Sequence, residues 1–114
     1  MTKGYWIARV DVRDEAAYKD YVAANGAAFA KFGGRFLIRG GRYDAVMGQA
    51  RSRNVVIEFP TYEDALACWN SDLYQQAKAK QRGGVEAEIL VIEGYEGPQP
   101  SASEPAPPST PASE

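Results

Sequence analysis

Residues 5–12, YWIARVDV, begin the pattern that decides the fold of this chain. Aromatic and β-branched residues fill most of these eight positions, which is typical of a β-strand. Asp14 follows as an N-cap, and side chains at spacings of three and four then mark one face of a helix: Tyr18, Tyr21, Val22, Asn25, Ala28, Phe29 and Phe32. Gly33 and Gly34 end this helix, and residues 35–39 (RFLIR) start a second strand.

The second half of the chain repeats this order. Residues 54–59 (NVVIEF) predict a strand, Pro60 and Thr61 open a helix, and residues 70–72 interrupt it before a second helical piece. Another glycine pair follows, and then a last strand over residues 87–93 (AEILVIE). Two β-α-β units in one small domain predict a ferredoxin-like α+β sandwich, with a four-stranded antiparallel sheet and two helices on one face. Between the halves, residues 40–53 are expected to add a hairpin or an edge extension.

The C-terminal composition differs sharply from the rest. Six of the seven prolines lie in residues 97–114, which contain no aromatic and no basic residue. Such a segment buries too little apolar surface to offset its ordering entropy, so we expect a disordered Pro/Ser-rich tail. The acids Glu104 and Glu114 lie in this tail, so residues 1–96 balance 13 acids with 13 bases. About 96 residues make one domain.

Composition also excludes several classes of function. The chain has no histidine, which rules out Ser-His-Asp catalysis and His-ligated zinc or haem within it. Cys68 is the single cysteine and has no intramolecular partner, so we expect a cytoplasmic protein. No apolar run spans a bilayer, and a neutral domain has no general affinity for nucleic acid. A local basic patch remains open, since five arginines cluster in sequence: Arg35, Arg39, Arg42, Arg51 and Arg53.

Both faces of the predicted sheet are apolar. In the first strand Trp6, Ala8 and Val10 alternate with Tyr5 and Ile7, and the third and last strands alternate in the same way. Helices cover one face only, so the other face is an exposed apolar patch that needs a partner. We expect a homodimer with sheet packed on sheet through this open face.

Four segments of the chain carry a resemblance to a known family: the YWIARVDV opening, AFAKFGGRFLIRGG from residue 28, VVIEFPTYEDA from residue 55, and SDLYQQAKAKQR from residue 71 with the later EILVIEG. Together they resemble the family catalogued as domain of unknown function 1330, within the dimeric α+β barrel superfamily. The resemblance implies the ferredoxin-like fold and the dimer. It implies no settled reaction.

Better understood branches of that superfamily include cofactor-independent monooxygenases that act on quinol-like aromatics, haem-degrading enzymes and lactone isomerases. Their sites lie between sheet and helices. Transfer of any of these activities rests on fold analogy. The haem-degrading branch is disfavoured further, because the histidine that it commonly uses as ligand is absent here.

Arg39 and Glu58 are the leading catalytic candidates, because both are charges within apolar strands that we expect to be neighbours. In the functional interpretation Arg39 holds a substrate carboxylate or enolate and Glu58 acts as general base. In the structural interpretation, which we favour, the two form an ion pair that fixes strand register or the dimer interface.

An aromatic group supplies the candidate ligand-binding residues. Phe36, Trp69 and Tyr74 are predicted to wall an apolar pocket, with the hydroxyls of Ser71 and Tyr74 offered to a ligand. The structural alternative makes Ser71 a helix cap and the aromatic rings part of the core. We expect Cys68 to be a packing residue, and no cofactor or metal site is predicted.

The function predicted from these patterns is the binding of a small organic molecule in a pocket between sheet and helices. A cofactor-free isomerase or monooxygenase-like reaction is the first version of this hypothesis. The alternative is a non-catalytic binding or structural dimer module. A weaker hypothesis makes the proline-rich tail a docking segment for another protein.

Overall fold

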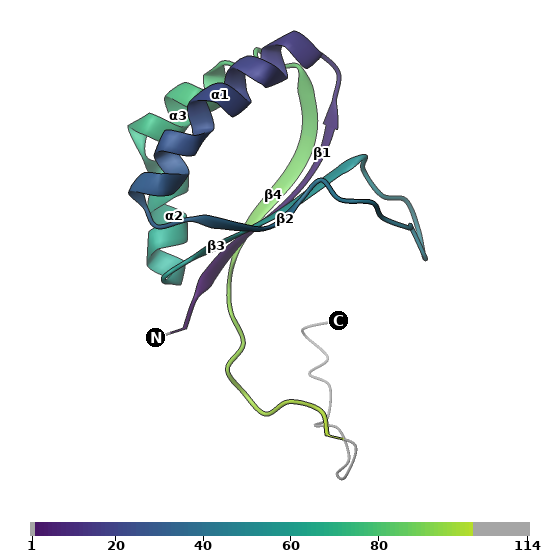
Figure 1. The fold of residues 1–114 in the computed structure, drawn as a ribbon, viewed down its shortest axis with the longest axis vertical. Coiled ribbons are helices and arrows are strands. Elements are labelled where there is room, and N and C mark those ends of the chain that lie inside the picture. Colours follow the sequence, from purple (N-terminus) through teal and green to yellow (C-terminus); the bar gives the residue numbers. More distant parts are fainter. Residues whose placement is uncertain (1, 102–114) are drawn as a thin grey trace.

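Four antiparallel strands and three helices make up the chain (Figure 1), which the computed structural model describes over residues 2–101. The elements in chain order are β1 (Gly4–Val12), α1 (Glu15–Lys31), β2 (Arg35–Arg39), β3 (Arg53–Phe59), α2 (Tyr62–Asn70), α3 (Asp72–Ala79) and β4 (Val85–Glu93). The sheet order is β2-β3-β1-β4, so each β-α-β unit leaves a gap that a strand of the other unit fills. The prediction of a ferredoxin-like α+β fold is confirmed.

The register of the sheet fixes which side chains face the helices. Trp6 lies opposite Ile57 on β3 and Val91 on β4, and Ala8 lies opposite Val55 and Ile89. Because opposed residues share a face, these side chains point together toward α1, α2 and α3. The helices all lie on that side of the sheet (Figure 1).

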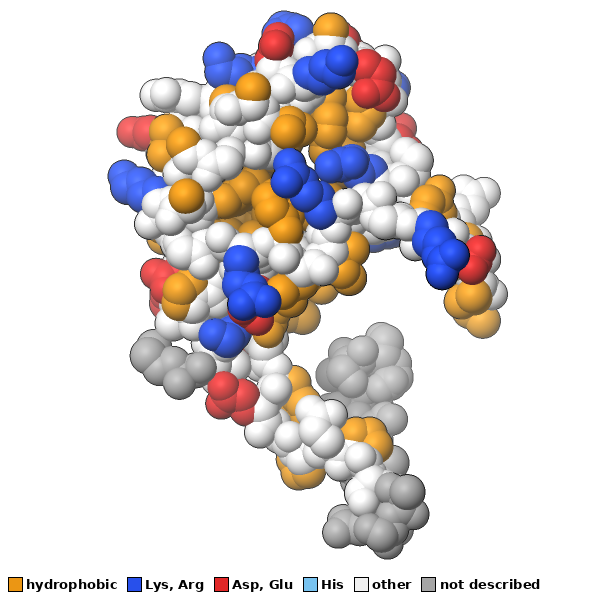
Figure 2. Space-filling view, viewed as in Figure 1, with side chains coloured by type: hydrophobic (Ala, Val, Ile, Leu, Met, Phe, Trp, Pro, Cys, Tyr) orange, Lys and Arg blue, Asp and Glu red, His pale blue; other side chains and the backbone are white. Residues whose placement is uncertain are grey.

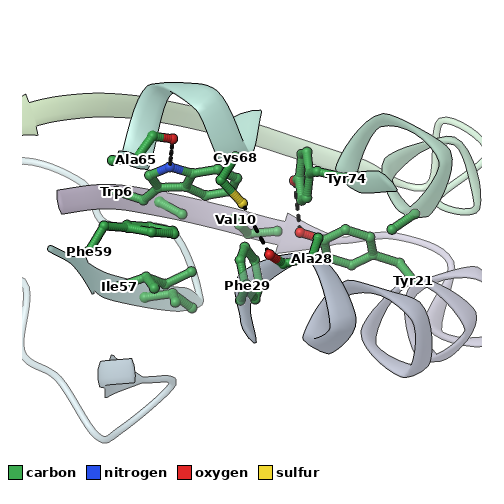
Figure 3. Packing of buried hydrophobic residues seen from close by; sticks show 13 residues of the cluster. Trp6, Val10, Tyr21, Ala28, Phe29, Ile57, Phe59, Ala65, Cys68 and Tyr74 are labelled. Atoms are coloured by element: carbon green, nitrogen blue, oxygen red, sulfur yellow. Dashed lines mark hydrogen bonds between the residues drawn. The ribbon is translucent and has the colours of Figure 1, made fainter. Parts of the chain in front are cut away.

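Trp6 is the centre of the core (Figure 3). Its ring centroid lies 4.9 Å from that of Tyr74 and 5.2 Å from that of Phe29, both edge to face. The indole Nε1 donates a hydrogen bond of 2.8 Å to the Ala65 carbonyl, so the one polar atom of this side chain is satisfied in α2. One strand residue therefore ties together the sheet and all three helices.

Side-chain caps begin each helix where the sequence indicates. The side chain of Asp14 accepts a hydrogen bond from Ala17 N, and Thr61 Oγ1 accepts one from Asp64 N. Ser71 Oγ accepts from Tyr74 N and donates to the Cys68 carbonyl, so one hydroxyl ends α2 and starts α3. The predicted break at residues 70–72 thus separates two helices.

The expectation of a hairpin between the two halves is wrong. Residues 40–52, the β2–β3 arm, contain no strand and project away from the helices (Figure 1). Gly40 and Gly48 have φ of +67° and +70°, and Val46 and Met47 are more than 90% exposed. The positive φ values of these two glycines interrupt the extended backbone that a strand needs.

The middle of the sheet face opposite the helices is apolar and exposed, while charged residues such as Glu58 and Glu88 lie toward its ends. Its exposed side chains come from three strands: Ile7 on β1, Ile38 on β2, and Leu90 and Ile92 on β4. No helix within residues 2–101 is long and apolar enough to cross a membrane. Of the predicted C-terminal tail, residues 102–114 lie outside the described part of the chain, and residues 97–100 form no helix or strand.

Candidate functional site

A cavity of about 460 Å³ lies between the sheet and the helices α1 and α3. β1, β3 and β4 form its floor, and side chains at the ends of β2 and α3 reach its mouth. Four small residues line it, Ala8, Ala79, Gly83 and Ala87, and they leave space that larger side chains would fill. Basic side chains lie beside a hollow floored by hydrophobic ones in Figure 2.

Aromatic rings form much of the cavity wall. Trp6, Phe29, Phe36, Trp69 and Tyr74 all line it, and the rings of Trp69 and Tyr74 lie 5.3 Å apart with an interplanar angle of 36°. Flat, rigid side chains of this kind offer large contact areas to a planar ligand. The predicted pocket residues Phe36, Trp69 and Tyr74 are therefore brought together.

Two of the tyrosines that line the cavity pair through buried hydroxyls. Tyr21 on α1 and Tyr74 on α3 share a hydrogen bond of 2.8 Å between their oxygens (Figure 3). Burial raises the pKa of both phenols above the usual value of tyrosine. Both groups are thus neutral at physiological pH and act as hydrogen-bonding groups rather than as phenolates.

Arg53 and Tyr18 form a second polar group at the mouth. Arg53 Nε donates a hydrogen bond of 3.0 Å to the Tyr18 hydroxyl, and its guanidinium carbon lies 5.6 Å from the centre of the Tyr18 ring. Gly40 makes room for this side chain, because a Cβ at position 40 would lie 2.7 Å from Arg53 Nη1. With a φ of +67°, this position also favours glycine conformationally.

Arg39 lies at the end of β2 on the same face of the sheet as Arg53. Its guanidinium carbon lies 4.3 Å from the centre of the Phe36 ring, a cation-π contact. Arg39 lines the cavity, and the part of the chain that the structure describes offers it no hydrogen-bonding side chain or acidic partner. Arg39 is exposed, so its donors are accessible to solvent.

The structure does not bring Arg39 and Glu58 together. Arg39 pairs in register with Val55, and Glu58 pairs with Arg35 three positions further along β3, so the two charges point to opposite faces of the sheet. Glu58 instead accepts a hydrogen bond of 3.2 Å from the Tyr5 hydroxyl and lies 3.7 Å from Arg35. Neither the catalytic pair nor the structural Arg39–Glu58 ion pair forms within this chain.

Two further predicted residues have structural positions. Ser71 caps α3 and does not line the cavity. Cys68 is fully buried, its Sγ lies 3.7 Å from the Ala28 carbonyl, and burial raises the pKa of its thiol to about 12. The thiolate is therefore scarce at neutral pH, as expected for a packing residue. No group of three or more potential metal-ligating side chains occurs within residues 2–101.

The comparison with known families decides the affiliation of the chain. The sequence profile of the family described as Domain of unknown function (DUF1330) matches residues 3–95, which include every strand and helix. The chain belongs to the DUF1330 family. No curated protein matches it in sequence.

Solved structures share the fold of this DUF1330 chain. A protein of unknown function from Rhodopseudomonas palustris, RPA0582, superposes with a TM-score of 0.69 at 14% identity, over 84% of this chain and 85% of that one. SnoaB, a cofactor-independent oxygenase from Streptomyces nogalater, gives a TM-score of 0.60 at 12% identity, over 85% and 97% of the two chains. At these identities the likeness shows the ferredoxin-like α+β fold alone.

Sequence reasoning missed Tyr18, Tyr21 and Arg53 as cavity residues of the DUF1330 chain. The two tyrosines lie on the helix face that periodicity assigns to the core, and a cavity within a core has no separate periodic signal. Arg53 was one of five clustered arginines without a distinguishing mark. Arg53 lies two residues before Val55 on β3, and residues two apart on a strand point to the same face. This spacing is the signal that could have placed Arg53 on the helix-facing side.

Proposed function

We propose that the protein binds a small, planar, largely apolar organic molecule in the cavity between its sheet and its helices. The observation that carries the proposal is an aromatic-walled cavity of about 460 Å³ with a small number of polar groups at its centre and mouth. Ligand sites in proteins fall in the range of about 300–1,000 Å³ and combine apolar walls with a few oriented polar groups. Tyr18, Arg39 and Arg53 supply such groups in the lining of this cavity.

A cavity-blocking variant tests this proposal. Ala79 lines the cavity near the end of α3, so Ala79→Trp should obstruct the mouth and lower the affinity for aromatic compounds at least about tenfold. Gln76→Trp is the matched control, because residue 76 is exposed on the same helix and does not line the cavity. Binding of a panel of naphthalene and indole compounds is measured by ligand-observed NMR. Equal binding by both variants would contradict the proposal.

We also propose that two copies of the chain associate through the open face of the sheet. Ile7, Ile38, Leu90 and Ile92 supply exposed apolar area across three strands, and Val56 lies between them. Contiguous exposed patches of this kind mark interfaces, and two-fold symmetry matches such a face with its own copy. The apolar tip of the β2–β3 arm, Val46 and Met47, also projects away from the helices (Figure 1).

A cofactor-independent oxygenation is the second candidate function, and the hydroxyl of Tyr21, a residue that lines the cavity, favours it. With a quinol-like ligand, one atom of O₂ would enter the ring to give a hydroxyquinone and the other would leave as water. All four electrons come from the quinol. Neutral Tyr21 would hold one oxygen atom of the quinol by a hydrogen bond. The fold similarity to SnoaB supports this candidate at the level of architecture alone.

Oxygen uptake distinguishes the catalytic candidate from a non-catalytic binding module. The probe is naphthalene-1,4-diol, with an oxygen electrode and a protein-free sample as reference. Catalysis predicts that wild-type protein consumes oxygen faster than both the reference and the Ala79→Trp variant. Equal rates of oxygen consumption in all three samples would indicate that the cavity binds a ligand without catalysis.

A further inference from the structure

We infer that the molecule held in the cavity is an aromatic acid, with its carboxylate at the mouth between Arg39 and Arg53 and its ring against the aromatic wall. The inference rests on the proposed binding function and adds the chemical class of the ligand. It follows from the distribution of acidic partners among the arginines, from the placement of the two guanidinium groups, and from the sign of the charge around the cavity.

The arginines of this chain fall into two groups. Five of them have an acidic side chain within 4.0 Å in the described residues: Arg9, Arg13, Arg35, Arg51 and Arg82. The described residues offer no such partner to Arg39, Arg53 or Arg42. Arg42 lies on the exposed β2–β3 arm, where water solvates it. The two arginines on the helix-facing side of the sheet, Arg39 and Arg53, thus line the cavity without acidic partners among the described residues.

The register of the sheet makes Arg39 and Arg53 diagonal neighbours. Arg39 pairs with Val55, and Arg53 lies two residues earlier on the same strand, hence on the same face. Diagonal positions of this kind lie about 7–8 Å apart, within reach of long side chains that point at a common ligand. Two like charges at this spacing repel each other, and an anion between them removes that repulsion.

Aromatic contacts hold both guanidinium groups in place. Arg39 stacks over Phe36 at 4.3 Å, and Arg53 stacks over Tyr18 at 5.6 Å and donates through Nε to the Tyr18 hydroxyl. The Nη atoms of both side chains keep donors for a ligand. A guanidinium fork that is already oriented loses little conformational freedom when it binds a carboxylate, which is the geometry that arginine matches best.

The charges around the cavity have one sign. Its charged lining residues in the described part of the chain are Arg39, Arg53, Lys78 and Arg82, and no aspartate or glutamate lines it. Arg82 is neutralised by Asp20, whose carboxylate oxygen lies 3.2 Å from its guanidinium. A cavity with basic groups at its mouth and aromatic rings in its wall favours a flat, apolar ligand that carries an anionic group at one end.

Matched acid and amide probes test the inference. The three pairs are benzoate with benzamide, 2-naphthoate with 2-naphthamide, and indole-3-acetate with indole-3-acetamide, titrated calorimetrically at pH 7.5. Each pair has nearly the same shape and differs in charge. For at least one pair we expect the acid to bind the wild-type protein about 10–100-fold more tightly than its amide, the range of one or two charge-assisted hydrogen bonds.

Single substitutions test whether the two arginines cause the preference for the acid over its amide. Arg39→Gln and Arg53→Gln should each lower the affinity for the acid about tenfold and leave that for the amide unchanged, while Arg53→Lys should recover part of it. Arg35→Gln, on the opposite face of the sheet, is the matched control and should change neither. Equal affinities for acid and amide in every pair overturn this inference and leave the proposed binding function intact. Absence of binding by both members of every pair overturns both.

Discussion

Gly4 lies where β1 passes closest to the start of α2. A Cβ at this position would lie 2.4 Å from the Thr61 carbonyl oxygen and 2.5 Å from Tyr62 Cα, both atoms of the backbone. Backbone cannot rotate away as a side chain can, so the added methyl group must push the strand and helix apart. We expect Gly4→Ala to lower the free energy of unfolding by about 1–3 kcal/mol, measured by urea denaturation followed by circular dichroism.

Gly26 provides the opposite case within the same protein. It lies inside α1, and a Cβ there would meet nothing within 4 Å. Gly26→Ala should therefore raise the free energy of unfolding by about 0.5–1 kcal/mol, because alanine loses less backbone entropy in a helix than glycine does. If both substitutions shifted stability in the same direction, the close approach at Gly4 would not be the cause.

Ser71 decides the junction between two elements. Its hydroxyl accepts a hydrogen bond of 3.1 Å from Tyr74 N and donates one of 2.7 Å to the Cys68 carbonyl, and it does not line the cavity. Ser71→Ala should cost about 1 kcal/mol of unfolding free energy and leave the affinity for cavity ligands unchanged. Ser71→Thr keeps the hydroxyl and should recover most of the loss. A drop in ligand affinity without a drop in stability would restore Ser71 as a binding residue.

Arg51 anchors the β2–β3 arm to two strands. Its guanidinium donates at 2.8 Å to Asp11 on β1 and at 2.6 Å to Glu88 on β4. A backbone hydrogen bond from Ser52 lowers the pKa of Asp11, and the Arg51 hydrogen bond lowers the pKa of Glu88. The folded state therefore binds protons less readily at these carboxylates than the unfolded chain does. The stabilisation is present above about pH 4 and is lost as the pH falls through the lowered pKa values.

The lowered pKa values of Asp11 and Glu88 give a pH-dependent prediction for Arg51→Gln. The variant should have a lower Tm than the wild-type protein at pH 7, and the difference should shrink toward pH 3 as the carboxylates become protonated. Calorimetric scans at both pH values measure it. Arg42→Gln is the control, since Arg42 lies on the same arm without an acidic partner among the described residues, and should leave Tm unchanged at both. An equal Tm difference at pH 7 and pH 3 argues against the ion-pair anchor.

At the scale of the whole molecule, the proposed dimer depends on the open sheet face. Ile7 lies in the middle of this face, opposite Val56 on β3 and Leu90 on β4. Ile7→Lys places a charge that would need desolvation in a sheet-to-sheet interface, so we expect it to abolish the proposed dimer. Sedimentation velocity at micromolar concentration should show the wild-type protein as a dimer and this variant as a folded monomer.

Leu73→Lys supplies the control for this prediction. Leu73 is exposed to the same extent as Ile7, at 36%, but lies on α3. Its substitution should leave the dimer intact. A wild-type monomer, or dissociation of both variants, would refute association through the open face.

Local patterns made most of the fold predictable. The signals that marked the elements act between residues close in the chain, so they are visible in the sequence. They are the glycine pairs at residues 33–34 and 83–84, the caps Asp14, Thr61 and Ser71, and the alternation in β1 and β3. The arm was mispredicted because Gly40 and Gly48 adopt positive φ values at either end of its alternating stretch. Glycine permits these values without requiring them, so they are fixed only in the folded chain.

The candidate site was predictable in part. Four of the predicted residues line the cavity, and they come from three elements: Phe36, Arg39, Trp69 and Tyr74. Glu58 and Ser71 do not line it. Arg39 and Glu58 were expected to be neighbours because their strands pair. A register that opposes Arg39 to Val55 and Glu58 to Arg35 places them on opposite faces. Strand order alone does not determine on which face a side chain lies; register does.

The sequence by itself determined the order of strands and helices, the helix caps and the two apolar faces of the sheet, because these depend on contacts between residues close in the chain. Only the tertiary structure decided that Arg39 and Arg53 share a cavity mouth without acidic partners, while Glu58 belongs to the open face. The physical reason is that the register and packing of strands far apart in the chain set the distances between charges. The electrostatic energy of two charges depends on their distance in space and not on their separation along the chain.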